Sequence, residues 1–373
     1  MIPKIVLSLL LGIMFSHSIS AQDKPHLSVS GSLKNPQIIA FDNLEQLEPL
    51  IDIHSVHDFA WSPDGSTFLV ADHYRLVLYT VSDFMAEPRV IEIEHPDNCS
   101  NWYCGIDSIK FLPDGDQFAL HTTPHTIAIY DFATLKPVRE LSGISGFNAD
   151  YTLRASAFKG EIRIVDALTE AVIETYYYEE LEDCDYVCGI PSPIFSSDNR
   201  YVIYSGLYTE YTGIIDRETG EITSPIDTRE VVGFTTDGRM IISLGIEPGY
   251  LSRGVVFTDV LTGKQVMWLD FPVATQPVFA PDGSGLMAVS GVDPFSGPNA
   301  YQSAMMVGFY DYDTLIQAES LTWEDAIYRF WTGESAGTVQ DYSFINKVEF
   351  SPDGKYLVSL RTNGEGIIWG VSP

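Results

Sequence analysis

The sequence predicts an all-β fold, a seven-bladed β-propeller with four-stranded blades and a ring that an N-terminal strand closes. Three observations predict this fold class. A short turn motif recurs seven times, further strand patterns follow each copy, and the last copy lacks one strand that the N-terminal region can supply. Residues 37–373 are therefore expected to form the propeller, preceded by a linker over 22–36.

The repeated motif is an aromatic residue followed three positions later by Asp. The seven copies run from Trp61 to Asp64, Phe111 to Asp114, Phe147 to Asp150, Phe195 to Asp198, Phe234 to Asp237, Phe279 to Asp282 and Phe350 to Asp353. Several copies contain Pro-Asp-Gly, in which Pro presets φ, Asp bonds back to the backbone and Gly accepts a positive φ. Strand patterns precede and follow each turn, as in Val348 to Phe350 and Tyr356 to Leu360. Each copy therefore predicts a β-hairpin.

A third and a fourth strand are expected after each hairpin. The third strand ends in Asp in five copies, at Asp131, Asp166, Asp216, Asp259 and Asp311. A second turn follows this Asp, and then a fourth strand such as Glu221 to Ile226. Four strands in one repeat are typical of a propeller blade.

Ring closure depends on the N-terminal region. The seventh copy ends at Val371 with three strands, which would leave a sheet edge unpaired. The segment Leu47 to Ile53 has the pattern of the fourth strand of the second copy, Leu135 to Leu141. We therefore expect Leu47 to Ile53 to pair with Gly366 to Val371.

The repeats resemble those of the WD-repeat propeller family, most clearly from Val348 to Ser359 and in Ile367-Ile368-Trp369. The likeness extends from about Ile38 to Val371. This chain lacks clear Gly-His pairs before its blades and has Trp369-Gly370 where the family usually has Trp-Asp. The resemblance implies a propeller that serves as a binding platform, and it names no partner.

Residues 1–21 have the order of a secretory signal peptide: Lys4, an apolar run from Ile5 to Phe15, then small polar residues to Ala21. We expect a secreted or periplasmic protein, and the alternative is a buried N-terminal strand. The apolar run is shorter than the ~20 residues that a membrane helix needs. No later stretch is long and apolar enough either, so no membrane insertion is expected.

Without Lys4 the chain has 20 basic and 51 acidic residues, a formal charge of −31. Such a surface repels phosphate backbones, so a nucleic-acid partner is not expected. The acidity either attracts cations or basic partners or serves solubility, including in a salty medium.

The cysteines form two local pairs, Cys99 with Cys104 and Cys184 with Cys188. In an exported protein this arrangement predicts two short disulfides, and a zinc site is the alternative. The loops that these disulfides would close carry the candidate binding residues of this chain, Trp102, Tyr103, Asp185 and Tyr186. These side chains either anchor a partner or cover their own disulfide.

The neighbouring run Glu179 to Asp183 either binds a hard cation such as calcium or is a solvated acidic loop.

The repeat spacing indicates insertions around the sixth copy. Successive motif Asp residues are 50, 36, 48, 39, 45 and 71 positions apart. The excess comes from Gly291 to Ser303 and from Thr322 to Ile345, which is rich in aromatic residues. Such loops either carry binding residues or pack against the side of the ring.

No catalytic motif fits the expected fold, and no catalytic, cofactor-binding or metal-ligating residue is assigned. Gly333 to Gly337 matches G-x-S-x-G, but no His follows His125 and a propeller offers no strand-turn-helix. His54 and His57 should point apart on a strand, and Pro124 separates His121 from His125. No cofactor is expected.

We therefore expect a non-enzymatic, exported platform that binds a protein or small ligand through its loop face. The alternative is an enzyme of the hydrolase, lyase or quinone-cofactor dehydrogenase type with its site at the mouth of the central channel. Convergence of carboxylates or histidines from several blades at that mouth would favour the enzyme. A third possibility is a component of a larger envelope assembly.

Overall fold

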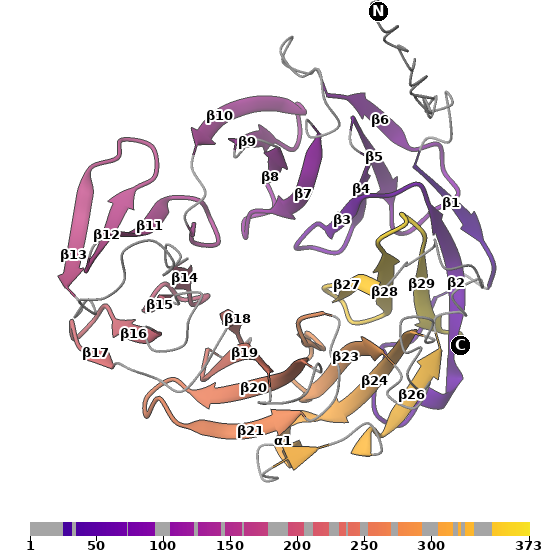
Figure 1. Ribbon diagram of the computed structural model, residues 1–373. Coiled ribbons are helices and arrows are strands. Elements are labelled where there is room, and N and C mark those ends of the chain that lie inside the picture. The colour runs from indigo at the N-terminus through magenta and orange to yellow at the C-terminus, as the bar shows by residue number, and fades with distance from the viewer. Residues whose placement is uncertain are drawn as a thin grey trace, which may run out of the picture.

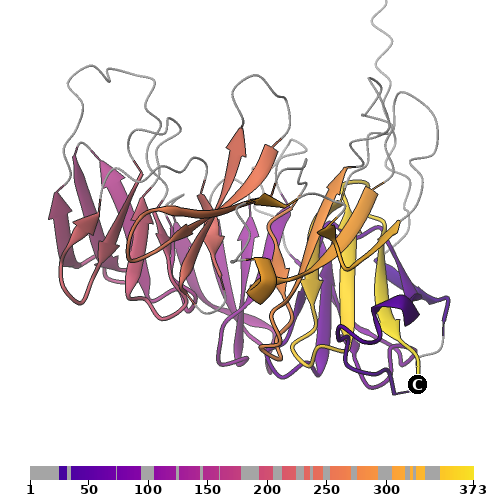
Figure 2. The same cartoon turned by 90° about the horizontal axis from the view of Figure 1, so that it is seen from below.

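Seven β-sheets surround a central axis in the computed structural model (Figure 1). The structure describes residues 25–373 with the exception of 32–34, 73, 94–104, 123–125, 143–145, 159, 178–192, 205–211, 224–230, 236–237, 247–252, 270–274, 293–304, 316–319, 322–324 and 332–344. The architecture is the predicted seven-bladed β-propeller. Seen edge-on, the strands of each blade run between the two faces of the ring (Figure 2).

The first three blades follow one another along the chain. Blade 1 consists of β3 (Asp58–Trp61), β4 (Thr67–Ala71), β5 (Arg75–Thr80) and β6 (Arg89–Glu92). Blade 2 consists of β7 (Ile106–Phe111), β8 (Gln117–Thr122), β9 (Thr126–Asp131) and β10 (Lys136–Ser142). Blade 3 consists of β11 (Leu153–Phe158), β12 (Glu161–Asp166) and β13 (Val172–Tyr177), with an inner segment that forms the single bridge Phe147 to Arg154.

The remaining blades continue this order around the ring. Blade 4 consists of β14 (Ile194–Phe195), β15 (Tyr201–Tyr204), β16 (Gly213–Asp216) and β17 (Ile222–Thr223). Blade 5 consists of β18 (Val231–Phe234), β19 (Met240–Ile246), β20 (Arg253–Asp259) and β21 (Gln265–Leu269). Blade 6 consists of β22 (Val278–Phe279), β23 (Leu286–Val292), β24 (Met305–Asp311) and β26 (Tyr328–Trp331). Blade 7 consists of β27 (Ile345–Phe350), β28 (Tyr356–Arg361), β29 (Gly366–Val371) and β2 (Leu47–His54).

The N-terminal strand closes the ring as predicted. Strand β2 pairs antiparallel with β29, with Leu47 opposite Val371 and Ile53 opposite Gly366. A further strand, β1 (His26–Val29), pairs with the outer edge of β2 and makes blade 7 five-stranded. This strand lies in the segment 22–36, which was expected to be a linker. The short 3-10 helix η1 (Leu44–Gln46) precedes β2.

Both classes of turn are held by an aspartate. In blade 1, Asp64 Oδ1 accepts hydrogen bonds from Ser62 Oγ at 2.6 Å and from Ser66 N at 3.0 Å, and Gly65 has φ +69°. At the second turn of blade 2, Thr134 donates from both its backbone N and its Oγ1 to Asp131 Oδ1. These bonds explain why the two Asp positions recur with the blades.

The apolar core lies between the faces of neighbouring blades. Between blades 7 and 1, Trp61 stacks on Tyr356 with ring centroids 6.0 Å apart and lies against Phe68 at 4.5 Å. Strand residues alternate between the two faces of a blade, so each blade buries one set against each neighbour. The motif aromatics therefore hold adjacent blades together.

Part of the expected insertion over 322–345 belongs to the ring itself. Strand β26 is the fourth strand of blade 6, and Tyr328 packs against Phe309 with ring centroids 6.3 Å apart. Before it, α1 (Tyr312–Leu315) is followed by β25 (Ser320–Leu321), which pairs in parallel with β21 of blade 5. For Tyr328, packing against the ring is the correct alternative. In the described part of the chain, no helix is long and apolar enough to cross a membrane.

Candidate ligand cavity in the central channel

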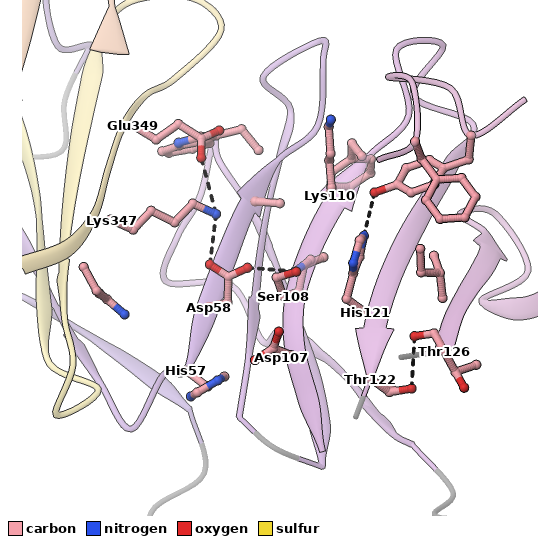
Figure 3. A pocket seen from close by; sticks show the side chains of 18 of the residues that line it. His57, Asp58, Asp107, Ser108, Lys110, His121, Thr122, Thr126, Lys347 and Glu349 are labelled. Carbon is pink, nitrogen blue, oxygen red and sulfur yellow. Dashed lines mark hydrogen bonds and ion pairs between the residues drawn. The ribbon is translucent and has the colours of Figure 1, made fainter. Parts of the chain in front are cut away.

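A cavity of about 1160 Å³ lies at the channel side of blades 7, 1, 2 and 3, and we call it the channel cavity (Figure 3). Its walls carry both charged and aromatic side chains. The polar and charged residues among them include His57, Asp58, Asp107, Ser108, Lys110, His121, Thr122, Thr126, Tyr151, Asn346, Lys347 and Glu349. Most of these residues come from the innermost strands β3, β7 and β27 or from the residues just before them.

The repeat register explains why these side chains gather. The motif aromatic and the residue two positions before it pack on the preceding blade, as Phe111 and Ile109 do. Residues one and three positions before the aromatic lie on the opposite face, at the channel edge. In blades 7, 1 and 2, the residues one position before are Glu349, Ala60 and Lys110, and those three positions before are Lys347, Asp58 and Ser108.

Figure 3 shows these residues in three levels along the channel. Glu349 and Lys110 lie at the end nearer the hairpin turns, and Asp58, Ser108 and His121 lie in the middle. His57 and Asp107 lie at the other end, with Thr122 and Thr126. We call that end the loop-face mouth; β7 begins there and β8 ends there.

Asp58 joins three blades. Its side chain is 9% exposed, and Oδ1 accepts a hydrogen bond from Lys347 Nζ of blade 7 at 2.9 Å. Its Oδ2 accepts a hydrogen bond from the backbone N of Ile109 in blade 2 at 2.7 Å. Lys347 also donates to the carbonyl of Phe59 and lies 4.4 Å from the centre of that ring. Asp58 and Lys347 therefore serve the inter-blade contact, and they form a fixed wall of the cavity.

The charge of Lys347 is maintained by its neighbours. Enclosure by the ring lowers the pKa of Lys347, but Glu349 and Asp58 outweigh this effect and raise the pKa above its usual value. Glu349 lies 3.5 Å from Lys347, and 38% of its side chain is exposed. Protein nevertheless surrounds this carboxyl within the ring, and this loss of solvent raises the pKa of Glu349 while Lys347 opposes the rise.

Lys110 differs from Lys347 in having no fixed partner. It is exposed to the channel, and among the described residues it forms no hydrogen bond or ion pair. The surrounding protein lowers the pKa of Lys110, the charge of Lys347 lowers it further, and Glu349 opposes both. Lys110 is therefore an accessible amine that a ligand can reach.

His121 and Tyr151 form a polar pair between blades 2 and 3. His121 Nε2 lies 2.7 Å from Tyr151 Oη, and the two rings meet edge to face at 5.7 Å. Burial and the charge of Lys110 lower the pKa of His121, while Asp107 and Asp58 oppose this. Burial raises the pKa of Tyr151. At neutral pH both groups are uncharged, so this contact is a neutral hydrogen bond.

His54 and His57 lie in different surroundings. His54 lies at the end of β2, where its Nε2 is 3.1 Å from Ser28 Oγ and its ring stacks on His26 at 4.8 Å. His57 lines the channel cavity instead, because the chain turns at Ser55 between β2 and β3. The expectation for His54 and His57 assumed one regular strand carrying both, whereas β2 ends at His54 and His57 directly precedes β3. His125 lies outside the described residues.

The candidate site residues of the sequence analysis lie outside the described part of the chain. They are Cys99, Cys104, Cys184, Cys188, Trp102, Tyr103, Asp185 and Tyr186, together with the acidic run 179–183 and the motif 333–337. The two disulfides and the binding role of these loops stay predictions.

Sequence reasoning missed Lys110, Asp58, Lys347 and Glu349 as parts of one site. The signal was present in the repeat alignment, because charged residues occur one or three positions before the aromatic only in blades 7, 1 and 2 among the described positions. The pattern indicates a shared site only when the strand register shows that these positions face the channel.

The channel cavity has no strong donor set for a metal. Within the described segments, no three His, Cys, Asp or Glu side chains come together as ligands of one ion. No known family model matches the chain, and no curated protein matches it significantly. What the protein does must therefore be inferred from the cavity itself.

Proposed function

We propose that the protein is an exported binding platform whose ligand enters the channel cavity through the loop-face mouth. The observation that carries this proposal is a cavity of about 1160 Å³ in which Lys110 is accessible and without a partner among the described residues. Ligand sites are typically concave, largely pre-formed and equipped with a few placed polar groups. The channel cavity has these properties.

The fixed part of the wall supports binding. Asp58 and Lys347 are held by contacts across three blades, so they do not need to be ordered when a ligand arrives. Pre-organised walls reduce the entropy that binding costs. The signal-like segment 1–21 supports export, and the likeness to WD repeats supports a platform role.

A specific observation also favours an enzyme as the second candidate. Carboxylates from blades 7, 1 and 2 and histidines from blades 1 and 2 converge in the channel, which was the condition for a channel-mouth enzyme. His121 and Tyr151 are neutral groups in direct contact, and such a pair can pass a proton between Nε2 and Oη. Substrate turnover distinguishes this candidate from a platform.

A thermal-shift screen tests the proposal. The purified protein is heated with a panel of small molecules and short peptides, in parallel with Lys110→Ala and the control Lys136→Ala. Lys136 begins β10, the outermost strand of blade 2, and is exposed, so its loss leaves the channel cavity unchanged. A ligand at 100 times its Kd adds about 2.7 kcal/mol to the free energy of unfolding.

We expect at least one ligand to raise the Tm of the wild type and of Lys136→Ala but not of Lys110→Ala. Ligands that stabilise all three proteins equally would contradict the proposal. Mass analysis of each stabilising compound after incubation shows whether it is recovered unchanged, as expected for a platform, or converted, as expected for an enzyme.

A further inference from the structure

Two opposite charges flank one small residue at the turn end of the channel cavity. Glu349 of blade 7 and Lys110 of blade 2 occupy the same position of the repeat, and Ala60 of blade 1 occupies it between them. Figure 3 shows Glu349 and Lys110 at the same level of the channel. A carboxylate and an amine therefore lie on either side of a gap.

The remaining four blades carry no charge at this repeat position. Their residues there are Gly146, Ile194, Gly233 and Val278. Gly146 is required by packing, because a Cβ there would lie 1.6 Å from the carbonyl oxygen of Pro193 in blade 4. Blade 3 therefore places no side chain at this repeat position, next to Lys110 of blade 2.

Glu349 and Lys110 keep unused binding capacity. Among the described residues, Glu349 pairs with Lys347 at 3.5 Å, and no ion pair joins Glu349 to Lys110. Lys347 is already engaged by Asp58 and by the carbonyl of Phe59. One carboxylate and one amine thus face the channel with room for a further charged partner each.

We propose that the channel cavity binds a zwitterion, an amino acid or short peptide with a free ammonium and a free carboxylate. The carboxylate binds at Lys110, the ammonium binds at Glu349, and the apolar part of the ligand faces the uncharged blades. This inference rests on the proposed function and names its ligand class.

Charge balance favours a zwitterion over a simple ion. An anion is attracted by Lys110 but is repelled by Glu349 and by a chain with a formal net charge of −30. A cation is attracted by Glu349 and by the net negative charge of the chain, but it is repelled by Lys110 and Lys347 at the cavity wall itself. A ligand with both charges forms two charge-assisted contacts and meets no unpaired charge.

Calorimetric titration of the full chain tests the inference. The probes are leucine and leucyl-leucine, each as the free zwitterion, as the N-acetylated acid and as the C-terminal amide. We expect the free forms to bind and each cap to weaken binding by roughly 10- to 100-fold, the range of one hydrogen bond to a charged group. Wild-type protein alone decides this comparison, so the test does not depend on any variant folding.

Two variants then assign the ends of the ligand. With Lys110→Gln, the C-terminal amide and the free zwitterion are expected to bind equally weakly. With Glu349→Gln, the N-acetylated acid and the free zwitterion are expected to bind equally weakly. The controls are Lys136→Gln and Glu140→Gln, which replace matched residues on β10, the outermost strand of blade 2. Both controls should bind like the wild type.

Two results would overturn the inference. Capped probes that bind as tightly as the free forms would show that the charges are not recognised. Free forms that do not bind would exclude this ligand class, while the proposed function would stand if the thermal-shift screen finds another ligand that depends on Lys110. If that screen also finds none, the proposed function fails as well.

Discussion

Tyr151 has a positive φ at a repeat position where the other described copies have Gly or Asn. Its φ is +57°, at the turn position where the described copies otherwise have Asn199 or glycines such as Gly115. A Cβ at Gly115 would point at Pro63 of the preceding blade, 3.4 Å away. The same geometry directs the ring of Tyr151 between blades 2 and 3, where it is 3% exposed. Burial of this ring offsets a backbone cost of about 1–2 kcal/mol.

Two substitutions separate the roles of Tyr151. Tyr151→Phe keeps the ring but removes the contact with His121, and we expect the free energy of unfolding to fall by about 0.5–1.5 kcal/mol. Tyr151→Gly relieves the backbone but leaves a cavity, and we expect a larger loss of about 2 kcal/mol or more. Denaturant titration measures both. A Gly variant as stable as the wild type would show that the ring does not hold the blades together.

Lys110 and Lys347 should titrate in opposite directions from the usual lysine. Enclosure in the ring lowers the pKa of Lys110, whereas Glu349 and Asp58 raise that of Lys347. Only a neutral amine attacks acetic anhydride, so Lys110 should reach half-maximal acetylation at a lower pH than Lys347. Peptide mass mapping over a pH series gives both midpoints. Equal midpoints would contradict the charge distribution described for the channel cavity.

At the scale of the turns, several aspartates share one electrostatic property. Hydrogen bonds from Ser62 and Ser66 lower the pKa of Asp64 from its usual 3.8, and bonds from Thr134 do the same for Asp131. Such a group stabilises the fold above its unfolded-state pKa, and this contribution is lost as the pH falls through the lower, folded-state pKa. Acid should therefore loosen the turns of several blades together.

We expect the Tm to be insensitive to these aspartates near neutral pH and to fall steadily as the pH drops below about 4. Scanning calorimetry between pH 7 and pH 3 measures the fall. The variant Asp131→Asn removes one titrating group, so its Tm should be lower at pH 7 and should depend less on pH. An unchanged slope in this variant would show that the Asp131 turn does not contribute.

The contact between blades 7, 1 and 2 should behave as a coupled unit. Asp58→Ala removes the acceptor of the backbone N of Ile109 and one of the two carboxylates that pair with Lys347, and we expect a loss of about 1–3 kcal/mol in the free energy of unfolding. In Asp58→Ala with Lys347→Met the bond between these two side chains is lost only once, so the loss should be smaller than the sum of the two single losses. A double-mutant cycle by chemical denaturation measures the coupling. Strict additivity would show that the two side chains act independently.

The elements of this fold differ in how far sequence can predict them. The hairpin turns and the third strands that end in Asp were predictable, because Pro-Asp-Gly and alternating residues act within a few positions. Strand β1 was not, because its four residues form a strand only when β2 offers a free edge. Strand β26 was not predictable either, because its pairing with β24 depends on the three-dimensional arrangement of blade 6.

The channel cavity was predictable only in part. The residue types at Lys110 and Glu349 stand in the repeat alignment, but their meeting depends on three blades being adjacent in a closed ring. The bonds of Asp58 to Ile109 N and to Lys347 Nζ cross 51 and 289 residues of sequence. No local pattern reports such contacts.

For the whole molecule, closure depends on a contact between the two ends of the chain. Strand β2 supplies Leu50, Ile51 and Ile53, each 0% exposed, to the core between blades 7 and 1. Without β2, strand β29 would expose an unpaired edge and this core would open to water. Strand β1 covers only the outside of β2, and three of its four residues are exposed.

Two truncations therefore test closure. A chain that begins at residue 35 lacks β1 and should unfold cooperatively, with a Tm only a few degrees below that of the full chain. A chain that begins at residue 56 also lacks β2, and we expect it to lose the single cooperative transition and to associate through the free edge of β29. Scanning calorimetry and size-exclusion chromatography measure these outcomes. If the chain that begins at residue 56 stays monomeric and keeps the wild-type Tm, blade 7 does not need its N-terminal strand. The remaining contacts between the blades would then be enough to hold the ring closed.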